Sequence, residues 1–196
     1  MAEKVYCIVK RDGNYYIPVK ARYNPYNGRE AYLACLPNFF GGNIERGECH
    51  YLGLAREVRE ESQGNVSIDA ECLRASNFQL LYHCQYENRN RIDHYRFYLV
   101  TMTEDGDYFH EDVILLDNQA ARPNAEKEMS CILKIPVNRL AGTNNHELLQ
   151  ICKDGVSSSE SLGEILVDIT PGSNALRDWN AHEGTKDAFS ALLALR

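Results

Sequence analysis

The sequence predicts an α+β fold in which strands surround one early helix and further helices follow late in the chain. Strand-like runs dominate the first half, helical spacing without proline occupies residues 50–62, and two more helical stretches lie near the end. The chain has 196 residues, of which 44% are hydrophobic and 25% charged. This length suits one domain, and this composition excludes wholesale disorder. We therefore expect a single domain over residues 1–196, with a helical C-terminal region.

A β-hairpin is expected at the beginning of the chain. The strand-like runs Val5–Lys10 and Tyr15–Lys20 flank an Asp-Gly dipeptide, which favours the positive φ angles of a tight turn. Residues 22–30 then contain the turn-forming segment NPYNG, which predicts an insertion-like loop. A short strand is expected to follow at Ala31–Leu36.

The middle of the chain predicts an antiparallel pair of strands and a long excursion. Asn77–Tyr86 and Ile92–Thr103 are strand-like and are separated by a short polar segment. Residues 104–125 are acidic with one apolar patch, and we interpret them as an excursion rather than a second domain. Met129–Ile135 predicts another strand, which Pro136 ends.

Two helices are expected in the C-terminal region, at residues 145–153 and 185–195. The serine-rich stretch Ser157–Ser161 between them is interpreted as a surface loop. Trp179 follows this stretch, and a residue of its size most simply serves as a packing anchor for the C-terminal region.

Charge, cysteines and hydropathy restrict the classes of function. The formal net charge is −7 and no block of Lys or Arg is present, so nucleic acid is an unfavourable partner and any polyphosphate ligand needs a cation beside it. The seven cysteines are scattered without C-x-x-C spacing, which argues against a disulfide framework or a zinc cluster. We see neither a signal peptide nor a run of about 18 apolar residues. A cytoplasmic protein without a membrane span is expected, and a homodimer stays open.

The predicted helix over residues 50–62 carries the clearest chemical signal. Glu57, Glu60 and Glu61 fall within an arc of roughly 100°, beside a stripe of apolar residues that keeps this face near the fold. Clustered carboxylates benefit from cations, and hard ions such as Mg²⁺ suit them. Gly53 and His50 lie on the same face, where the glycine would leave room for a metal, water or phosphate. An isolated acidic helix face, however, is usually only solvated.

The spacing around this helix adds to the signal. Gly42 precedes Glu48 by five intervening residues, seven more separate Glu48 from Arg56-Glu57, and Glu60-Glu61 completes the pattern. This arrangement resembles the Nudix box, G-x5-E-x7-R-E-U-x-E-E-x-G-U with U aliphatic, over residues 42–64. Gln63 replaces the final glycine of the box, so we expect a remodelled helix exit. The resemblance implies a Nudix-like α/β/α sandwich with a mixed central sheet.

The resemblance also implies roles for individual residues. The implied ligands of Mg²⁺ or Mn²⁺ are Glu57, Glu60, Glu61 and the backbone carbonyl of Gly41. Arg56 and Glu48 would brace the loop and helix through an ion pair, and Glu57 could alternatively act as the base. Family members often recruit a later carboxylate, for which Glu128 is the first candidate and Glu126 the second.

Candidates for substrate binding are aromatic and basic residues. Phe40 next to Phe39, together with Tyr82 and Tyr98 on the strands, could stack on a base, although aromatic residues in strands are more often core. Arg22 and Arg29 flank the predicted loop and could clamp a phosphate.

The function that we predict is divalent-metal-dependent hydrolysis of the pyrophosphate linkage in a nucleoside diphosphate linked to another moiety. ADP-ribose, a dinucleoside polyphosphate or a nucleotide sugar would be such a small-molecule substrate. Two alternatives stay open. One is a non-catalytic module of the same fold that binds a nucleotide or ADP-ribose, and the other is a hydrolase of RNA 5′ ends.

Overall fold

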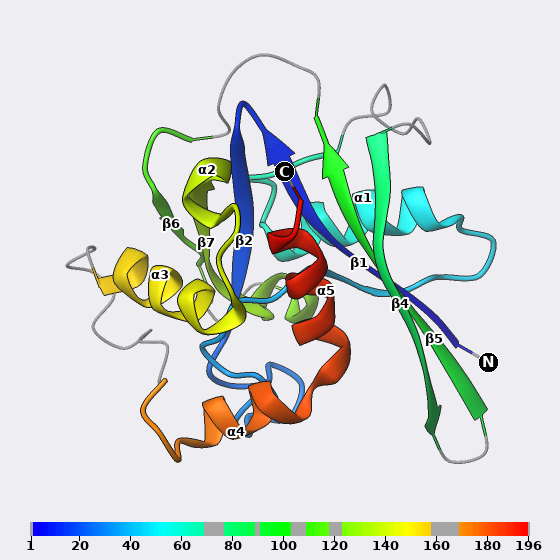
Figure 1. Cartoon of the computed structure of the whole chain (residues 1–196). Coiled ribbons are helices and arrows are strands. Elements are labelled where there is room, and N and C mark those ends of the chain that lie inside the picture. Colours follow the sequence, from blue (N-terminus) through cyan, green and yellow to red (C-terminus); the bar gives the residue numbers. More distant parts are fainter. Residues whose placement is uncertain are drawn as a thin grey trace.

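The computed structural model describes residues 2–68, 77–88, 91–102, 109–117, 123–157 and 169–195. A seven-stranded sheet forms the centre (Figure 1), in the order β4-β5-β1-β2-β7-β6, and β3 pairs with β1. The strands are β1 (Ala2–Arg11), β2 (Asn14–Lys20), β3 (Phe40–Asn43), β4 (Phe78–Asn88), β5 (Arg91–Thr101), β6 (Val113–Leu115) and β7 (Met129–Pro136). The sheet is mixed, because β1 and β5 run parallel and the other pairs are antiparallel.

Helices cover both faces of this sheet. They are α1 (His50–Glu61), α2 (Val137–Leu140), α3 (Asn145–Ser157), α4 (Asn174–Ala181) and α5 (Glu183–Leu193), with a 3-10 turn, η3 (Asn124–Lys127). Figure 1 shows α1 behind the sheet and α3 and α5 in front of it. This arrangement confirms the predicted α+β class and the layered α/β/α sandwich with a mixed central sheet.

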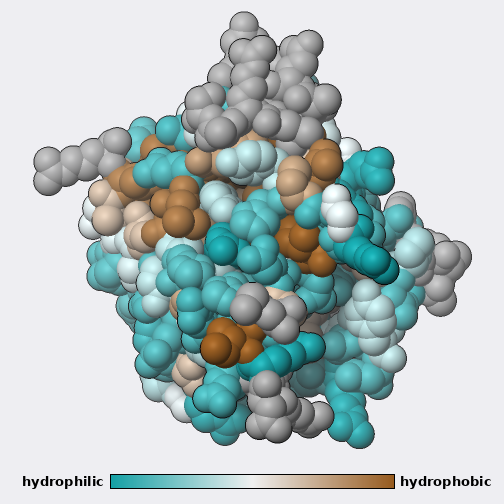
Figure 2. Space-filling model, turned by 90° about the vertical axis from the view of Figure 1, so that its right-hand side faces the viewer, coloured by the Kyte–Doolittle hydropathy of each residue, from teal (hydrophilic) through white to brown (hydrophobic). Residues whose placement is uncertain are grey.

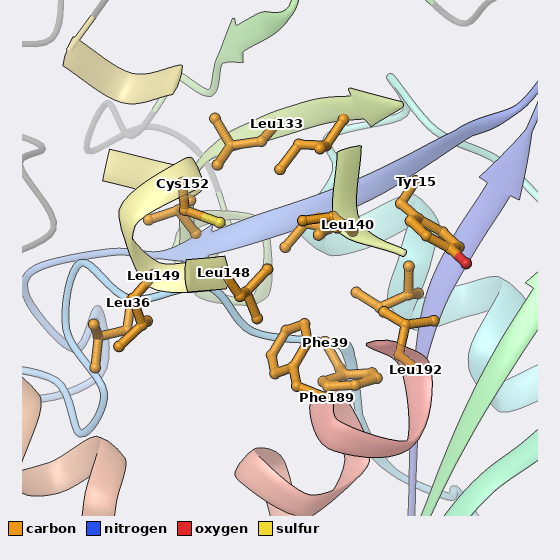
Figure 3. Close-up of a cluster of buried hydrophobic side chains, with 14 of the residues drawn as sticks. Tyr15, Leu36, Phe39, Leu133, Leu140, Leu148, Leu149, Cys152, Phe189 and Leu192 are labelled. Carbon is orange, nitrogen blue, oxygen red and sulfur yellow. The ribbon is translucent and has the colours of Figure 1, made fainter. Parts of the chain in front are cut away.

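Each face has its own hydrophobic core. Leu54 and Val58 of α1 pack with the residues of one face, whereas α3 and α5 pack with the other, where Phe39 contacts Phe189 at a ring distance of 4.5 Å (Figure 3). Neighbouring residues of an extended chain point to opposite faces. Phe40 consequently belongs to the core beneath α1, although Phe39 belongs to the core beneath α5.

The predicted hairpins are confirmed. Asp12 and Gly13 have φ angles of 46° and 71°, as a tight two-residue turn between β1 and β2 requires. β4 and β5 form the expected antiparallel pair. The strand predicted at the end of the long excursion is β7, and α3 and α5 appear close to the expected helices.

One local prediction differs from the structure, and the structure adds a strand and a helix that the sequence analysis does not predict. Ala31–Leu36 forms turns instead of a strand, because Leu33 and Cys35 have φ angles of 60° and 59°, which an extended chain does not allow. β3 was not predicted, since its sequence FGGN has low strand propensity. The additional helix α4 buries Trp179, which is 2% exposed, and thereby confirms the packing role expected of this residue.

Of the predicted excursion, residues 109–117 and 123–125 are described, and they include β6 and the beginning of η3. The predicted serine-rich loop lies outside the described residues from 158 onward. None of the described helices is both long and apolar enough to cross a membrane. Figure 2 shows the face that lies at the right of Figure 1, which is mostly hydrophilic with small apolar patches.

Candidate active site

A cavity of about 670 Å³ opens beside the C-terminal half of α1. β3, residues 23–26 and 31–33, the beginning of β7 and the beginning of α5 also line it. Its charged lining consists of five glutamates and two basic residues, Glu45, Glu57, Glu60, Glu61, Glu128, Lys20 and Arg56. The fold therefore brings Glu128 into the same cavity as the three helix glutamates.

Glu61 is the most deeply buried of these carboxylates. The apolar stripe of α1 turns this face toward the sheet, so that Glu61 is only 2% exposed. The backbone N–H of Gly41 donates a hydrogen bond of 2.7 Å to its Oε2 atom. Burial raises the pKa of Glu61 well above its usual range, and the opposing charge of Lys20 offsets only part of this effect.

The carboxylate of Glu57 lies against Gly42, the second of the two glycines in β3. A Cβ atom on Gly42 would lie 2.6 Å from Oε1 of Glu57, so this carboxylate occupies space that only glycine leaves open. Gly41, whose φ is 149°, approaches β1 so closely that a Cβ there would clash with the backbone of Val5 and Tyr6. Burial raises the pKa of Glu57, while the adjacent Arg56 lowers it. Gly42 thus leaves the space that the first helix carboxylate occupies, and Gly41 allows β3 to approach β1.

Arg56 connects the helix glutamates to the loop before α1. Its Nη1 atom lies 2.9 Å from Glu57 Oε1 and 3.2 Å from Glu60 Oε2, and its Nε atom lies 3.1 Å from Glu48 Oε1. Nη2 also donates to the carbonyl oxygen of Asn43 at 3.0 Å. The hydrogen bond from Arg56 holds the pKa of Glu48 below its usual range. Arg56 and Glu48 are thus placed where a bracing pair would have to lie.

Glu128 reaches the cavity from the residue before β7. Its Oε2 atom pairs with Lys20 Nζ at 2.7 Å, and its backbone carbonyl accepts the N–H of Ala21 at 2.9 Å. The pKa of the Tyr26 phenol is raised first by burial and then by the charge of Glu128 and a hydrogen bond to it. Glu126, the second candidate, does not belong to the described lining of the cavity.

The donor set agrees in kind with a hard divalent cation, because carboxylates outnumber basic groups in the cavity. Within the described residues, however, no three His, Cys, Asp or Glu side chains are already arranged around one metal position. Arg56 holds Glu57 and Glu60, Lys20 holds Glu128, and the Gly41 amide holds Glu61. A divalent ion would compete with Arg56 and Lys20 for these oxygens.

The aromatic candidates lie elsewhere. Phe40 is fully buried beneath α1, and Tyr98 packs on the same side with its ring 6.4 Å from that of Phe78. Tyr82 packs on the opposite face, where burial and a hydrogen bond to Asp187 raise its pKa. None of the three lines the described cavity, so their predicted role in base stacking has no support in its lining.

Arg22 and Arg29 are exposed and also stay outside the described lining, although residues between them contribute to it. The guanidinium of Arg22 instead lies over the ring of Tyr23, 5.9 Å from its centroid. Their expected phosphate contact therefore has no support in the lining of the cavity.

Two residues of the acidic helix face serve other contacts. His50 lies 2.8 Å from Glu3 Oε2, at the opposite end of α1 from Glu61. A Cβ on Gly53 would lie 2.5 Å from Ile44 Cδ1 and 3.1 Å from Glu48 Oε2. This glycine makes room for the loop before α1 rather than for a ligand, which corrects our expectation.

Sequence reasoning missed most of the aromatic lining. Tyr23, Tyr26 and Tyr32 are 59%, 61% and 53% exposed and stand at one side of the cavity. The other aromatic residues of the lining are Tyr6, Phe39, Tyr95, Phe97 and His182. Tyr95 and Phe97 are two positions apart on β5, so strand alternation places both on one face of the sheet and Tyr98 on the other. The alternation does not say which of these faces the cavity adjoins.

A comparison with models of protein families gives no match, and neither does a comparison with curated protein sequences. Among solved structures, the chain is similar to the ORF135 protein of E. coli, with 19% identity, a TM-score of 0.41, and coverage of 71% of this chain and 76% of that one. The chain is also similar to a MutT NUDIX hydrolase from Burkholderia pseudomallei, with 14% identity, a TM-score of 0.43, and coverage of 79% of this chain and 97% of that one. A third similar structure is an Ap4A hydrolase of C. elegans, with 12% identity, a TM-score of 0.40, and coverage of 92% of this chain and 96% of that one. These TM-scores are below 0.5, so the similarities do not by themselves assign a function.

Proposed function

We propose that this chain is a Nudix-type pyrophosphohydrolase. It hydrolyses the pyrophosphate linkage in a nucleoside diphosphate linked to another moiety, with the help of Mg²⁺ or Mn²⁺. The observation that carries the proposal is the convergence of Glu57, Glu60, Glu61 and Glu128 on one cavity. Three of these glutamates belong to the sequence pattern that resembles the Nudix box, and the fourth comes from a distant segment.

The charge of the cavity explains the need for metal ions. A pyrophosphate group is anionic, and five glutamates against two basic residues would repel it. Divalent cations between the carboxylates and the phosphates would convert this repulsion into attraction. The volume of about 670 Å³ lies in the range of small-molecule sites.

The residues of the cavity would have different roles in the reaction. Glu57, Glu60, Glu61 and Glu128, with the carbonyl of Gly41, would hold the ions. A bound divalent ion neutralises charge on the phosphate oxygens and lowers the pKa of the attacking water. Arg56 keeps the carboxylates of Glu57 and Glu60 in place. Glu57 could alternatively act as the base that accepts the proton of the attacking water.

The nucleoside end of the substrate would face the exposed tyrosines. We call residues 22–32 the tyrosine loop, after Tyr23, Tyr26 and Tyr32 at the cavity. Aromatic faces stack on any base, which suits a site that must hold a nucleoside at a fixed distance from the carboxylates. This loop therefore takes over the substrate-binding role that the sequence had suggested for Phe40, Tyr82 and Tyr98.

The test is an activity screen with Mg²⁺ and Mn²⁺. Substrates are ADP-ribose, NADH, diadenosine polyphosphates, nucleotide sugars, nucleoside triphosphates and triphosphorylated RNA, and the products are identified by mass. We expect two phosphate-bearing products from a nucleoside diphosphate derivative. Glu57→Gln should abolish most turnover, whereas the control Glu87→Gln, on the exposed part of β4, should not.

Two results would replace the proposal by an alternative. Tight nucleotide binding without turnover of any substrate would favour the non-catalytic module. Exclusive turnover of RNA 5′ ends would favour the third hypothesis, in spite of the net negative charge.

A further inference from the structure

Gln63 stands at the exit of α1, where the resembling pattern has glycine. Its φ angle is +55°, which places it in the left-handed region. The N–H of Gln63 donates to the carbonyl of Glu60 at 3.1 Å, and the N–H of Gly64 donates to that of Arg59 at 2.8 Å. This pair of bonds forms a Schellman motif, whose left-handed position is usually glycine. This left-handed backbone conformation is strained for glutamine, so the presence of glutamine instead of glycine requires an explanation.

The side chain of Gln63 joins two separate segments. Its Nε2 atom donates to the carbonyl oxygens of Asp117 and Glu126, and its Oε1 atom accepts the N–H of Asp117, each at 2.8 Å. Both Nε2 donors and one Oε1 lone pair are thereby used. A glycine at this position would relieve the backbone strain but would make none of these three bonds.

Both segments lead to β7 and Glu128. Glu126 lies in η3, two residues before Glu128, whose carboxylate enters the cavity. Asp117 follows β6, which pairs with β7, and the N–H of Leu116 donates to the carbonyl of Ser130 at 3.0 Å. Gln63 itself lies two residues after Glu61. The amide of one side chain thus connects the end of the helix that carries three glutamates to the segment that carries the fourth.

We propose that Gln63 is a positioning residue that sets the place of Glu128 relative to Glu57, Glu60 and Glu61. This inference rests on the proposed function, because it concerns how the same carboxylates act together. Gln63 does not belong to the described lining of the cavity, and it acts through the segments that it holds.

Hydrogen exchange tests the connection without reference to activity. In the full chain, Gln63→Gly should increase exchange of the Asp117 amide, since this amide loses its acceptor. Gln63→Asn should do the same, because asparagine tolerates the left-handed region but is one methylene shorter. Asn65→Ala is the matched control. It removes a bond to the Ser62 carbonyl at the same helix exit but no bond to Asp117 or Glu126.

Kinetics then separate positioning from general stability. With the substrate found in the screen, Gln63→Gly and Gln63→Asn should lower kcat about tenfold or more with little change in KM. Asn65→Ala should leave kcat near the wild-type value even if it lowers Tm. In a Glu128→Gln background, Gln63→Gly should have almost no further effect on kcat, because both changes disable the same group.

The outcomes are distinguishable from those of the proposed function. If the wild-type chain hydrolyses its substrate but both Gln63 variants keep its kcat, the inference on Gln63 is overturned and the proposed function stands. Fully additive effects of Gln63→Gly and Glu128→Gln would also overturn it. If no substrate is turned over, the proposed function fails. Independently of turnover, unchanged exchange of the Asp117 amide in both Gln63 variants would overturn the inference on Gln63.

Discussion

The two sides of the cavity are built in different ways. On the side of α1 and β3, carboxylates meet backbone groups in a buried setting, as in the bond from the Gly41 amide to Glu61. On the side of the tyrosine loop, three tyrosines are more than half exposed. This loop is shaped by local bonds, such as those from the amides of Tyr26 and Arg29 to the preceding asparagine side chains, both at 2.9 Å.

Under the proposed function, this difference would separate the residues of the reaction from those of substrate choice. The buried side holds its carboxylates through hydrogen bonds, as preorganised electrostatic stabilisation of a phosphate reaction would require. The loop can change its sequence without disturbing the sheet, and loops commonly carry specificity for this reason. Variants on the α1 side should therefore alter kcat, and variants in the loop should alter KM.

The largest effect is expected for Glu61→Gln. The substitution keeps an acceptor for the Gly41 amide but removes the buried charge, so kcat should fall by about two to three orders of magnitude. Mg²⁺ should raise the Tm of the wild-type chain and raise that of the variant less, because one ligand charge is lost. Enzyme assays and thermal scans with and without Mg²⁺ measure both effects. Equal stabilisation by Mg²⁺ together with unchanged kcat would contradict the role of Glu61.

A smaller loss is expected for Gly42→Ala. The added Cβ would meet the carboxylate of Glu57, which ends a flexible side chain, so the carboxylate should move while the backbone stays in place. We expect kcat to fall about 10- to 100-fold, as small displacements of catalytic groups do, with little change in Tm. Gly28→Ala is the matched control in the tyrosine loop. Its φ is +67° and no atom lies within 4 Å, so this variant strains the loop without reaching Glu57. If Gly28→Ala lowered kcat as much as Gly42→Ala, the two sides would not be distinct.

Tyr26→Ala should reveal the contribution of the tyrosine loop. Stacking of a base on an aromatic ring contributes about 1–3 kcal/mol, so KM should rise about tenfold with kcat nearly unchanged. Tyr26→Phe keeps the ring and removes the hydroxyl that contacts Glu128. It should keep KM close to the wild-type value if stacking dominates. A fall in kcat for both variants would instead place Tyr26 with the carboxylates.

Local sequence predicted those elements whose signals are local. The Asp12-Gly13 turn determines the first hairpin, and the apolar stripe of α1 determines which way its glutamates face. β3 could not be predicted in this way, because two glycines form a strand there only through pairing with β1. The buried leucines of residues 31–36 resemble a strand pattern, but turns with left-handed residues bury them equally well.

The candidate site was predictable to a similar extent. The helix glutamates, Arg56 and Glu48 follow from one continuous pattern, and Glu128, the first later carboxylate that we considered, lines the same cavity as the helix glutamates. Lys20 pairs with Glu128 across 108 positions of sequence, a contact that no local pattern encodes. Strand alternation states that Phe97 and Tyr98 face opposite ways, but the face of the cavity becomes known only when the helices are placed.

The smallest effect is expected in the pH dependence of stability, where the buried side should again differ from the loop. Burial raises the pKa of Glu61 in the folded chain above its ordinary value of 4.5. Below about pH 4.5 the group is protonated in both folded and unfolded chains, so wild type and Glu61→Gln should have similar stability. As the pH rises, the unfolded chain loses this proton first, and the wild type should become less stable than the variant by a few degrees in Tm. Thermal scans between acidic and neutral pH in the presence of a chelator measure this difference. A wild type that gained stability over Glu61→Gln with rising pH would mean that Glu61 is better solvated or paired than its burial indicates.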